Sequence, residues 1–330
     1  MTNTVKYKLF GFLTLLLALE PLTASAHVKW FVDSDDILAH ETVYLSLANP
    51  AILIWVVIVI GLASISILLD RKITALPSLL QQKMESWKPM INRLFYLLIA
   101  TWLIINSYQG FLLSPNFQVT SLPENLLLFV QFITGLTVFL RKLHPLAGGL
   151  LLITYLGSAI LNPGVEVFEN IFVIGIALYL AFHDNVKIKK LPQANVWAIP
   201  ILRVTTGASL IILAFTEKLL HPALAYAFLA KHNLNFMPML GMNWFNDQLF
   251  VISAGMTEVV FGIILIMGTI TRINTLALSF FFVSTTIILG PSEVMGHLPF
   301  FGTALLLIFF GSGEKLKIKI QRPNQLGNST

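Results

Sequence analysis

The chain has 330 residues, of which 56% are hydrophobic and only 11% are charged, and its mean hydropathy is +0.80. These values exclude a pair of soluble domains and indicate a protein whose solvent is the lipid bilayer. The formal net charge is +5, but the basic residues lie in short clusters between apolar segments, which argues against nucleic-acid binding. The sequence contains no cysteine, which excludes thiol catalysis, thiolate metal sites and quinone-coupled disulfide exchange.

The amino terminus has the pattern of a secretory signal peptide. Two lysines precede an apolar stretch over residues 9–19, and a triplet of small residues ends at Ala26. A basic segment, an apolar segment and a small-residue cleavage site are the three parts of a cleavable signal. We therefore expect cleavage after Ala26, which makes His27 the first mature residue. An uncleaved first span is the alternative, because Glu20 closes the apolar stretch early.

Apolar segments of membrane-spanning length recur along the rest of the chain. They predict an all-α fold, a polytopic bundle of membrane helices with about nine spans after signal cleavage. Several segments are close to the shortest length that crosses the hydrocarbon, so we expect them to pack together with little tilt. The expected spans are residues 51–69, 93–113, 125–140, 145–161, 168–182, 197–216, 248–270, 273–289 and 297–310.

The positions of the basic residues predict the orientation in the membrane. With the amino terminus outside, the alternation of spans puts every basic cluster but one in the cytoplasm, as the positive-inside rule requires. The exception is the segment 222–247, which we expect to lie on the outer surface as an interfacial helix and loop. The prediction is a bacterial inner-membrane protein with a periplasmic amino terminus and a cytoplasmic carboxyl terminus. The residues assigned to the cytoplasm are Arg71, Lys72, Lys83, Lys88, Arg93, Arg141, Lys142, Lys187, Lys189, Lys190, Arg272, Lys315, Lys317, Lys319 and Arg322.

An internal duplication is visible at an offset of 127 residues. An even number of spans in each copy makes the copies parallel, which weakens the case for a transporter built from inverted repeats. The expected organisation is two tandem four-helix units, which Arg93 and Arg203 open. The matched residues are Gly175, Ala177, Leu178, Leu180 and Phe182 with Gly302, Ala304, Leu305, Leu307 and Phe309, then Gln131 with Glu258, Gly135 with Gly262, and Asn170 with His297.

The expected domains follow from these patterns. They are a signal peptide (1–26), an outer segment with the first span and a cytoplasmic loop (27–92), the first four-helix unit (93–184), a cytoplasmic linker (185–196), the second four-helix unit (197–312) and a cytoplasmic tail (313–330).

The second unit carries a loose pattern of glycines, basic residues and acids. Its members are Arg203, Gly207, Glu217, Lys218 and Leu219 ahead of Pro222, then Glu258, Gly262, Gly268, Arg272, and the turn from Gly290 and Pro291 to His297. Over about residues 202–311 this pattern resembles the DoxX-like family of small four-helix membrane proteins, and residues 93–184 are similar to a degenerate copy. Such proteins are similar to the membrane subunit of a thiosulfate:quinone oxidoreductase and to maturation factors for periplasmic redox enzymes. The resemblance implies a quinone-facing or redox-accessory role.

The first unit departs from the pattern. Gln131 stands where the second unit has Glu258, and no acid-lysine pair precedes Pro115. We therefore expect the first unit to serve as scaffold.

Glu258 is an acidic residue near the middle of an expected span. A charge at that depth costs roughly 2.5 to 3.5 kcal/mol on insertion scales, and the residue lies roughly 15 Å from the outer end at 1.5 Å per residue. It must be protonated, paired or facing a wet cavity. We expect a proton acceptor or a contact with a quinone head group, or else a structural hydrogen bond to a residue such as Ser279 or Ser284.

Further acids and histidines gather at the outer ends of the spans. Glu217 and Lys218 end one span, His221 follows one turn later, and an ion pair at the interface is the simpler interpretation. No comparable acid lies in the inner half, which indicates a pocket that opens outward. The expected catalytic residues are Glu258, Glu217 and His297, and the expected cofactor-binding residues are Lys218, His221, Glu169 and Glu293.

A mature amino-terminal His27 would offer an amine and an imidazole together, a chelating pair that suits copper. His40 and Asp33 lie nearby in the sequence and complete a candidate metal site. The alternative is that these residues are simply solvated.

The preferred hypothesis is an accessory or quinone-interacting membrane subunit in periplasm-facing redox chemistry, with a periplasmic redox enzyme or another membrane subunit as its partner. An isoprenoid quinone is the expected cofactor, because its tail dissolves in the same medium as the helices. No haem, flavin or nucleotide motif is recognisable, so electrons would come from a partner or a bound quinone. The alternatives are uptake or delivery of copper or another divalent metal through His27, and a scaffold without chemistry. The sequence leaves open whether the protein is an enzyme.

Overall fold

A computed structural model describes residues 37–38, 45–46, 49–72, 77–183 and 194–318 of the chain. This part of the chain is all-α and contains 11 α-helices. A π-helical turn, Phe215–Leu219, continues α10. The helices are α4 (Pro50–Lys72), α5 (Ser78–Tyr108), α6 (Leu122–Val138), α7 (His144–Leu161), α8 (Val165–Glu169), α9 (Phe172–Phe182), α10 (Ala194–Ala214), α11 (Pro222–His232), α12 (Asp247–Met267), α13 (Thr271–Leu289) and α14 (Pro291–Phe310).

Within the described residues, seven helical segments are long and apolar enough to cross a membrane. This agrees with the expected class, and the protein is a multi-pass membrane protein. The helices α6 and α9 are apolar but shorter. The seven segments are Pro50–Asp70, Ser78–Tyr108, Arg141–Leu161, Ala194–Leu219, Asp247–Met267, Thr271–Leu289 and Glu293–Phe310.

The expected span at residues 168–182 is not one continuous helix. The helix α9 has 11 residues, about 16 Å at 1.5 Å per residue, which is about half of the hydrocarbon thickness. The chain bends between α8 and α9 at Asn170, whose Nδ2 donates to the carbonyl oxygen of Glu166 at 2.9 Å and to Ser114 Oγ at 3.3 Å. A polar side chain that donates to the carbonyl oxygen four residues earlier competes with the backbone N–H groups of the helix and interrupts it.

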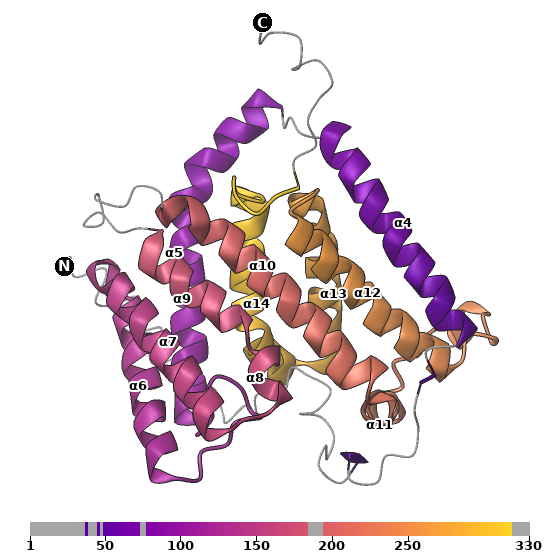
Figure 1. Cartoon of the computed structure of the whole chain (residues 1–330), viewed down its shortest axis with the longest axis horizontal. Coiled ribbons are helices and arrows are strands. Elements are labelled where there is room, and N and C mark those ends of the chain that lie inside the picture. The colour runs from indigo at the N-terminus through magenta and orange to yellow at the C-terminus, as the bar shows by residue number, and fades with distance from the viewer. Residues whose placement is uncertain (1–36, 39–44, 47–48, 73–76, 184–193, 319–330) are drawn as a thin grey trace, which may run out of the picture.

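Two helices begin earlier than their apolar segments predict. The helix α5 starts at Ser78 because its polar first turns are rich in good helix formers, and Lys88 pairs with Glu85 one turn away. These turns extend past the other helices at the top of Figure 1. The helix α14 starts at Pro291, so Glu293 and His297 lie inside it and not in a preceding turn.

Eight helices pack in a closed cycle of neighbours. In chain order α5, α6, α7, α9, α10, α12, α13 and α14 each contact the next, and α14 contacts α5 again. The helix α4 lies outside this cycle against α12, and α11 lies across one end of the bundle (Figure 1). Side-chain hydrogen bonds hold α4 in place, from Trp55 Nε1 to Ser253 Oγ at 3.1 Å and between Ser66 Oγ and Thr269 Oγ1 at 2.7 Å.

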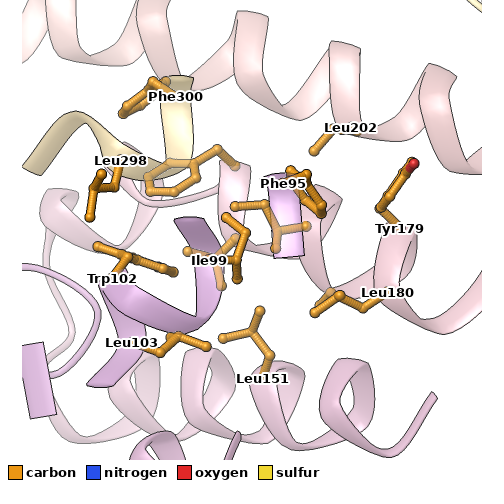
Figure 2. Packing of buried hydrophobic residues seen from close by; sticks show 14 of the residues in the cluster. Phe95, Ile99, Trp102, Leu103, Leu151, Tyr179, Leu180, Leu202, Leu298 and Phe300 are labelled. Carbon is orange, nitrogen blue, oxygen red and sulfur yellow. The ribbon is translucent and has the colours of Figure 1, made fainter. Parts of the chain in front are cut away.

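The largest apolar cluster lies where α5, α7, α9, α10 and α14 converge. Figure 2 shows Phe95, Ile99, Trp102 and Leu103 of α5 among side chains from the surrounding helices. All four are nearly or fully buried. The helix α5 therefore forms the centre of this cluster, and its neighbours are fixed in place around it.

Two glycines allow α10 and α12 to touch through their backbones. A Cβ built on Gly262 would lie 2.6 Å from the carbonyl oxygen of Gly207, and a Cβ on Gly207 would lie 2.6 Å from the carbonyl oxygen of Gly262. Small residues at helix crossings permit this close approach in membranes. The close crossing fixes where α12 presents its polar residue, Glu258, to α10.

We expect the substitution Gly262→Ala to destabilise the protein by about 1–3 kcal/mol, because the new methyl group overpacks the crossing. The matched control is Gly149→Ala in α7, since a Cβ at Gly149 meets nothing within 4 Å. Thermal unfolding of both variants in detergent measures the effect. Equal midpoints for the two variants would contradict the close crossing.

The amino terminus of α6 is closed by a capping box. Glu124 Oε2 accepts hydrogen bonds from the backbone N–H groups of Thr120 and Ser121, each at 2.8 Å, while the backbone N–H of Glu124 donates to Ser121 Oγ. The two backbone donors, followed by the Ser121 hydroxyl, lower the pKa of Glu124 from 4.5 to about 2. Asn162 Nδ2 also donates to Glu124 Oε1 at 3.2 Å, which ties the end of α7 to the start of α6.

We expect Glu124→Ala to lower the unfolding midpoint at pH 7, and Glu124→Gln to lower it less, because glutamine keeps an acceptor. The pKa of Glu124 is depressed in the folded state, so its contribution is fully present above about pH 4.5 and is lost as the pH falls towards 2. Thermal melts of wild type and Glu124→Ala should therefore converge over this pH range. A gap that stays constant with pH would be evidence against the charged cap.

Two arginines bind the carboxyl ends of helices at the end of the bundle opposite α11. Arg203 is fully buried and donates to the carbonyl oxygens of Leu265, Ile266, Ser312 and Leu316. Arg272 does the same for the last turn of α14, with Nε at 3.0 Å from the carbonyl oxygen of Ile308 and Nη2 at 3.4 Å from that of Phe309. The last carbonyls of a helix lack partners within the helix and carry partial negative charge. Both arginines thus have a structural role.

Candidate functional site

A π-helical turn at the end of α10 holds an acid and a lysine. The backbone N–H of Leu220 bonds to the carbonyl oxygen of Phe215, one residue further back than in an α-helix. Gly255 of α12 faces this turn, and a Cβ there would lie 3.0 Å from Leu219 and 3.3 Å from Lys218 Cβ. The absence of a side chain at Gly255 therefore lets the turn lie directly on α12. Isolated π-helical turns of this kind are frequent at functional sites.

Lys218 bridges two carboxyl groups from neighbouring helices. Its Nζ lies 3.1 Å from Glu258 Oε2 and 3.8 Å from Glu217 Oε2. Glu258 stands near the middle of α12, eleven residues after Asp247, which is about 16 Å along the helix. The side chain of Glu217 is almost completely buried, whereas that of Glu258 is 30% exposed and that of Lys218 is 14% exposed. An ammonium group is thus the partner that allows an acid at this depth.

A second acid-base pair lies on α14. His297 Nδ1 is 3.3 Å from Glu293 Oε1, and both side chains are buried. The imidazole packs among the rings of Phe282, Phe300 and Phe301. Glu293 also lies within electrostatic range of Lys218 and Glu217, so the two pairs are neighbours. We call Glu217, Lys218, Glu258, Glu293 and His297 the Lys218 cluster.

The other expected site residues lie at the start of α11 and at the end of α8. His221 is half-buried at the start of α11, beyond the π-helical turn. Glu169 is buried at the end of α8, where Asn116 Nδ2 lies 3.4 Å from its Oε2 and Ser209 Oγ of α10 donates to its carbonyl oxygen. Glu169 therefore belongs to a second polar group between α8 and α10.

Sequence reasoning missed the main contact of the cluster. Ser279 and Ser284, considered as partners of Glu258, instead donate to the carbonyl oxygens of Thr275 and Phe280 in their own helix. The expected interfacial pair of Glu217 and Lys218 was also incomplete, because Lys218 lies closer to Glu258 than to Glu217. The signal that could have found this contact is opposite charge in two neighbouring spans.

The proposed metal ligands His27, His40 and Asp33 lie outside the described residues. Within the described part of the chain, no group of three or more histidine, aspartate or glutamate side chains is arranged to hold a metal ion.

The Lys218 cluster contains one ammonium group, one imidazole and three carboxyl groups in an otherwise apolar bundle. Such a set can donate hydrogen bonds from Lys218, accept them at the carboxyl oxygens, and hold a variable number of protons.

The chain matches no protein-family model, no curated protein and no solved structure.

We expect Lys218→Met to destabilise the protein by about 3 kcal/mol, the low end for breaking a buried ion pair, because Glu258 is partly exposed. The double variant Lys218→Met with Glu258→Gln should recover much of this loss, since it leaves fewer charges without a partner. Chemical or thermal unfolding of the single and double variants forms the cycle. Additive losses would show that the two side chains do not interact.

Proposed function

We propose that the protein is an accessory or quinone-interacting membrane subunit, and that the Lys218 cluster binds the head group of a lipid-soluble redox carrier. The observation that carries this proposal is the contact of Lys218 Nζ with Glu258 Oε2, at 3.1 Å, near the middle of an apolar helix. An isoprenoid quinone dissolves at that depth because its tail is hydrocarbon. Its oxygens also match the donors and acceptors of the pair.

The groups of the cluster fit this ligand class. Lys218 can donate a hydrogen bond to a carbonyl oxygen, and the carboxyl of Glu258 can accept one from a hydroxyl group. A bound quinone would supply the exchange of electrons and protons. The carboxyl of Glu258 would hold or release a proton beside the head group, and Glu217, Glu293 and His297 would connect that proton to the α11 end of the bundle. Electrons would come from a partner, since the chain has no recognisable haem, flavin or nucleotide motif.

We also propose that the bundle consists of two tandem four-helix units, α5 to α9 and α10 to α14. Equivalent glycines make equivalent contacts in the two halves. Gly135 of α6 faces Ala100 and Ile104 of α5, while Gly262 of α12 faces Gly207 and Ile211 of α10. The two glycines lie 127 residues apart in the sequence. Their contact residues on α5 and α10 lie 107 residues apart, since Ala100 corresponds to Gly207 and Ile104 to Ile211.

The contacts between the two units support the same register. Gly175 of α9 faces Leu202 and Thr205 of α10, and Gly302 of α14 faces Phe95 and Leu98 of α5. The offsets are again 127 for the glycines and 107 for their partners. The longer segment that contains α11 accounts for the difference.

This register pairs Arg203 with Tyr96, and not with Arg93 as the sequence comparison suggested. The carbonyl oxygen of Leu265 accepts from Arg203, and that of Val138, its equivalent in α6, accepts from His144. The ring of Tyr96 packs against that of His144. Different side chains thus cap the same helix end in each unit.

In the proposed topology the α11 end faces the periplasm and the arginine end faces the cytoplasm. The nine expected spans then include α6 and the α8–α9 pair. The loop after α11 exposes Phe236, Met239, Leu240 and Trp244. Exposed apolar and indole side chains at the end of a membrane bundle suit the interface between lipid and water. The resemblance to the DoxX-like family remains part of this proposal through Glu217, Lys218 and Glu258.

The test is quinone retention by the purified protein. Breaking a hydrogen bond to a charged group costs about 1.5–3 kcal/mol, so Glu258→Gln should reduce quinone content roughly tenfold or more. Organic extraction and mass spectrometry of protein purified from native membranes would measure it. The matched control is Glu85→Gln, because Glu85 is an exposed acid on the first turns of α5.

Two outcomes would refute the proposal. One is quinone content no higher than in an unrelated membrane protein purified in the same way. The other is full retention by a correctly folded Glu258→Gln variant, which would leave the scaffold interpretation in place.

A further inference from the structure

The two units differ in how tightly their second and third helices pack. The helices α6 and α7 of the first unit pack closely, whereas α13 packs closely on α14 and only lightly on α12. Phe261 of α12 makes two contacts with α13: Asn274 Nδ2 donates to its carbonyl oxygen at 3.1 Å, and its ring lies 5.6 Å from that of Phe281. We call the boundary between α12 and α13, from Phe261 towards the α11 end, the α12–α13 seam.

The residue that fills the boundary in the first unit has a small counterpart in the second. A Cβ on Gly157 of α7 would lie 2.6 Å from Leu127 Cδ1, so Leu127 of α6 packs directly onto Gly157. At the offset that relates Gln131 to Glu258, the counterpart of Leu127 is Ala254. Alanine lacks the branched end that contacts α7, whereas Ser284, the counterpart of Gly157 at the same offset, is larger than glycine. The two residues together give the α12–α13 seam slightly less side-chain volume at this level.

The polar residues at the paired positions, Gln131 and Glu258, differ in their solvent exposure. Gln131 is completely buried, and its amide bonds to the backbone N–H of Leu113 at 2.8 Å and to the carbonyl oxygen of Phe111 at 2.9 Å. Glu258 occupies the equivalent position of α12, yet its side chain is 30% exposed. Residue 258 also lies on the helix face between Gly255, which contacts the π-helical turn, and Phe261, which contacts α13.

The surroundings of the seam are hydrocarbon. The side chains of Phe280, Phe281 and Val283 on α13 are all exposed, and no charged residue lies between Asn274 and Leu289. In a membrane these side chains face lipid tails. A molecule that reaches Glu258 through the seam must therefore be dissolved in the bilayer.

We infer that the α12–α13 seam is a lateral entrance from the bilayer to the Lys218–Glu258 pair, used by a lipid-soluble molecule with a hydrogen-bonding head group. The identity of that molecule as a quinone rests on the proposed function; the entrance itself does not. The head group passes Ala254 and meets Glu258, while the hydrocarbon tail stays among the lipids beside α13. The first unit lacks such an entrance because Leu127 closes it.

The test uses a hexadecanol that carries a photoactivatable diazirine close to its hydroxyl group, in vesicles that contain the full-length protein. Peptide mass spectrometry locates the adducts after illumination. We expect labelling of Glu258 in wild type and a reduction of roughly tenfold in Ala254→Leu, which restores the residue that closes the first unit. The matched control is Val283→Leu, which adds the same kind of bulk on the exposed face of α13 and should leave Glu258 labelling unchanged.

Adducts on the exposed face of α13 report that each variant is folded and embedded. If that face is labelled and Glu258 is not, or if Ala254→Leu does not reduce labelling at Glu258, the lateral entrance is refuted. Quinone retention is measured on the same preparations. Labelling of Glu258 without bound quinone would support the entrance and refute the proposed function. Quinone retention that depends on Glu258, without labelling of Glu258, would support the proposed function and refute the entrance.

Discussion

The structure depends on one constraint, which is that a charged or polar group surrounded by hydrocarbon must find its partner inside the protein. Each buried charge in the described bundle meets this condition in its own way. At one end, Arg203 and Arg272 donate to helix-end carbonyls that have no partner within the helix, where the backbone itself supplies the partial negative charge. At the other end, Lys218 meets carboxylates supplied by side chains. The donors of the two arginines are satisfied by backbone acceptors that do not titrate. The group around Lys218 contains carboxyl groups, so the number of protons that it holds can change.

The same constraint explains why the positions that the proposed repeat pairs carry different residues. Gln131 satisfies its amide with backbone groups of the segment that follows α5, so this position is neutral and closed. At Glu258, which the proposed repeat pairs with Gln131, the π-helical turn brings Lys218 against a carboxyl group instead of an amide. The structural hydrogen bonds of Gln131 and the ionisable pair of Lys218 and Glu258 thus differ by two side chains and one altered helical turn.

Hydrophobic runs in the sequence predicted the class of the fold and the approximate position of most helices, because lipid demands long apolar segments. They predicted helix ends less well. Polar helix formers extended α5 back to Ser78, and the hydrogen bonds of Asn170 split the segment over 168–182, which apolar length alone does not reveal. For the candidate site, the cost of intramembrane charge singled out Glu258, Glu217 and His297. Opposite charge in neighbouring spans was the available signal for the contact between Lys218 and Glu258. Its geometry could not be predicted, because it requires the extra residue of the π-helical turn and the close approach at Gly255.

The partial exposure of Glu258 is what favours function over mere stability. A carboxyl at this depth costs roughly 2.5 to 3.5 kcal/mol on insertion scales, and the first half avoids that cost with a buried glutamine. Filling the seam with a leucine, as at Leu127, would shield the pair further and add apolar contact, yet the chain has Ala254 there. Ala254 provides neither the shielding of the charged pair nor the added apolar contact, although Leu127 provides apolar contact at the paired position. Packing alone does not readily explain this choice. An opening that admits a ligand to Lys218 and Glu258 explains both departures at once.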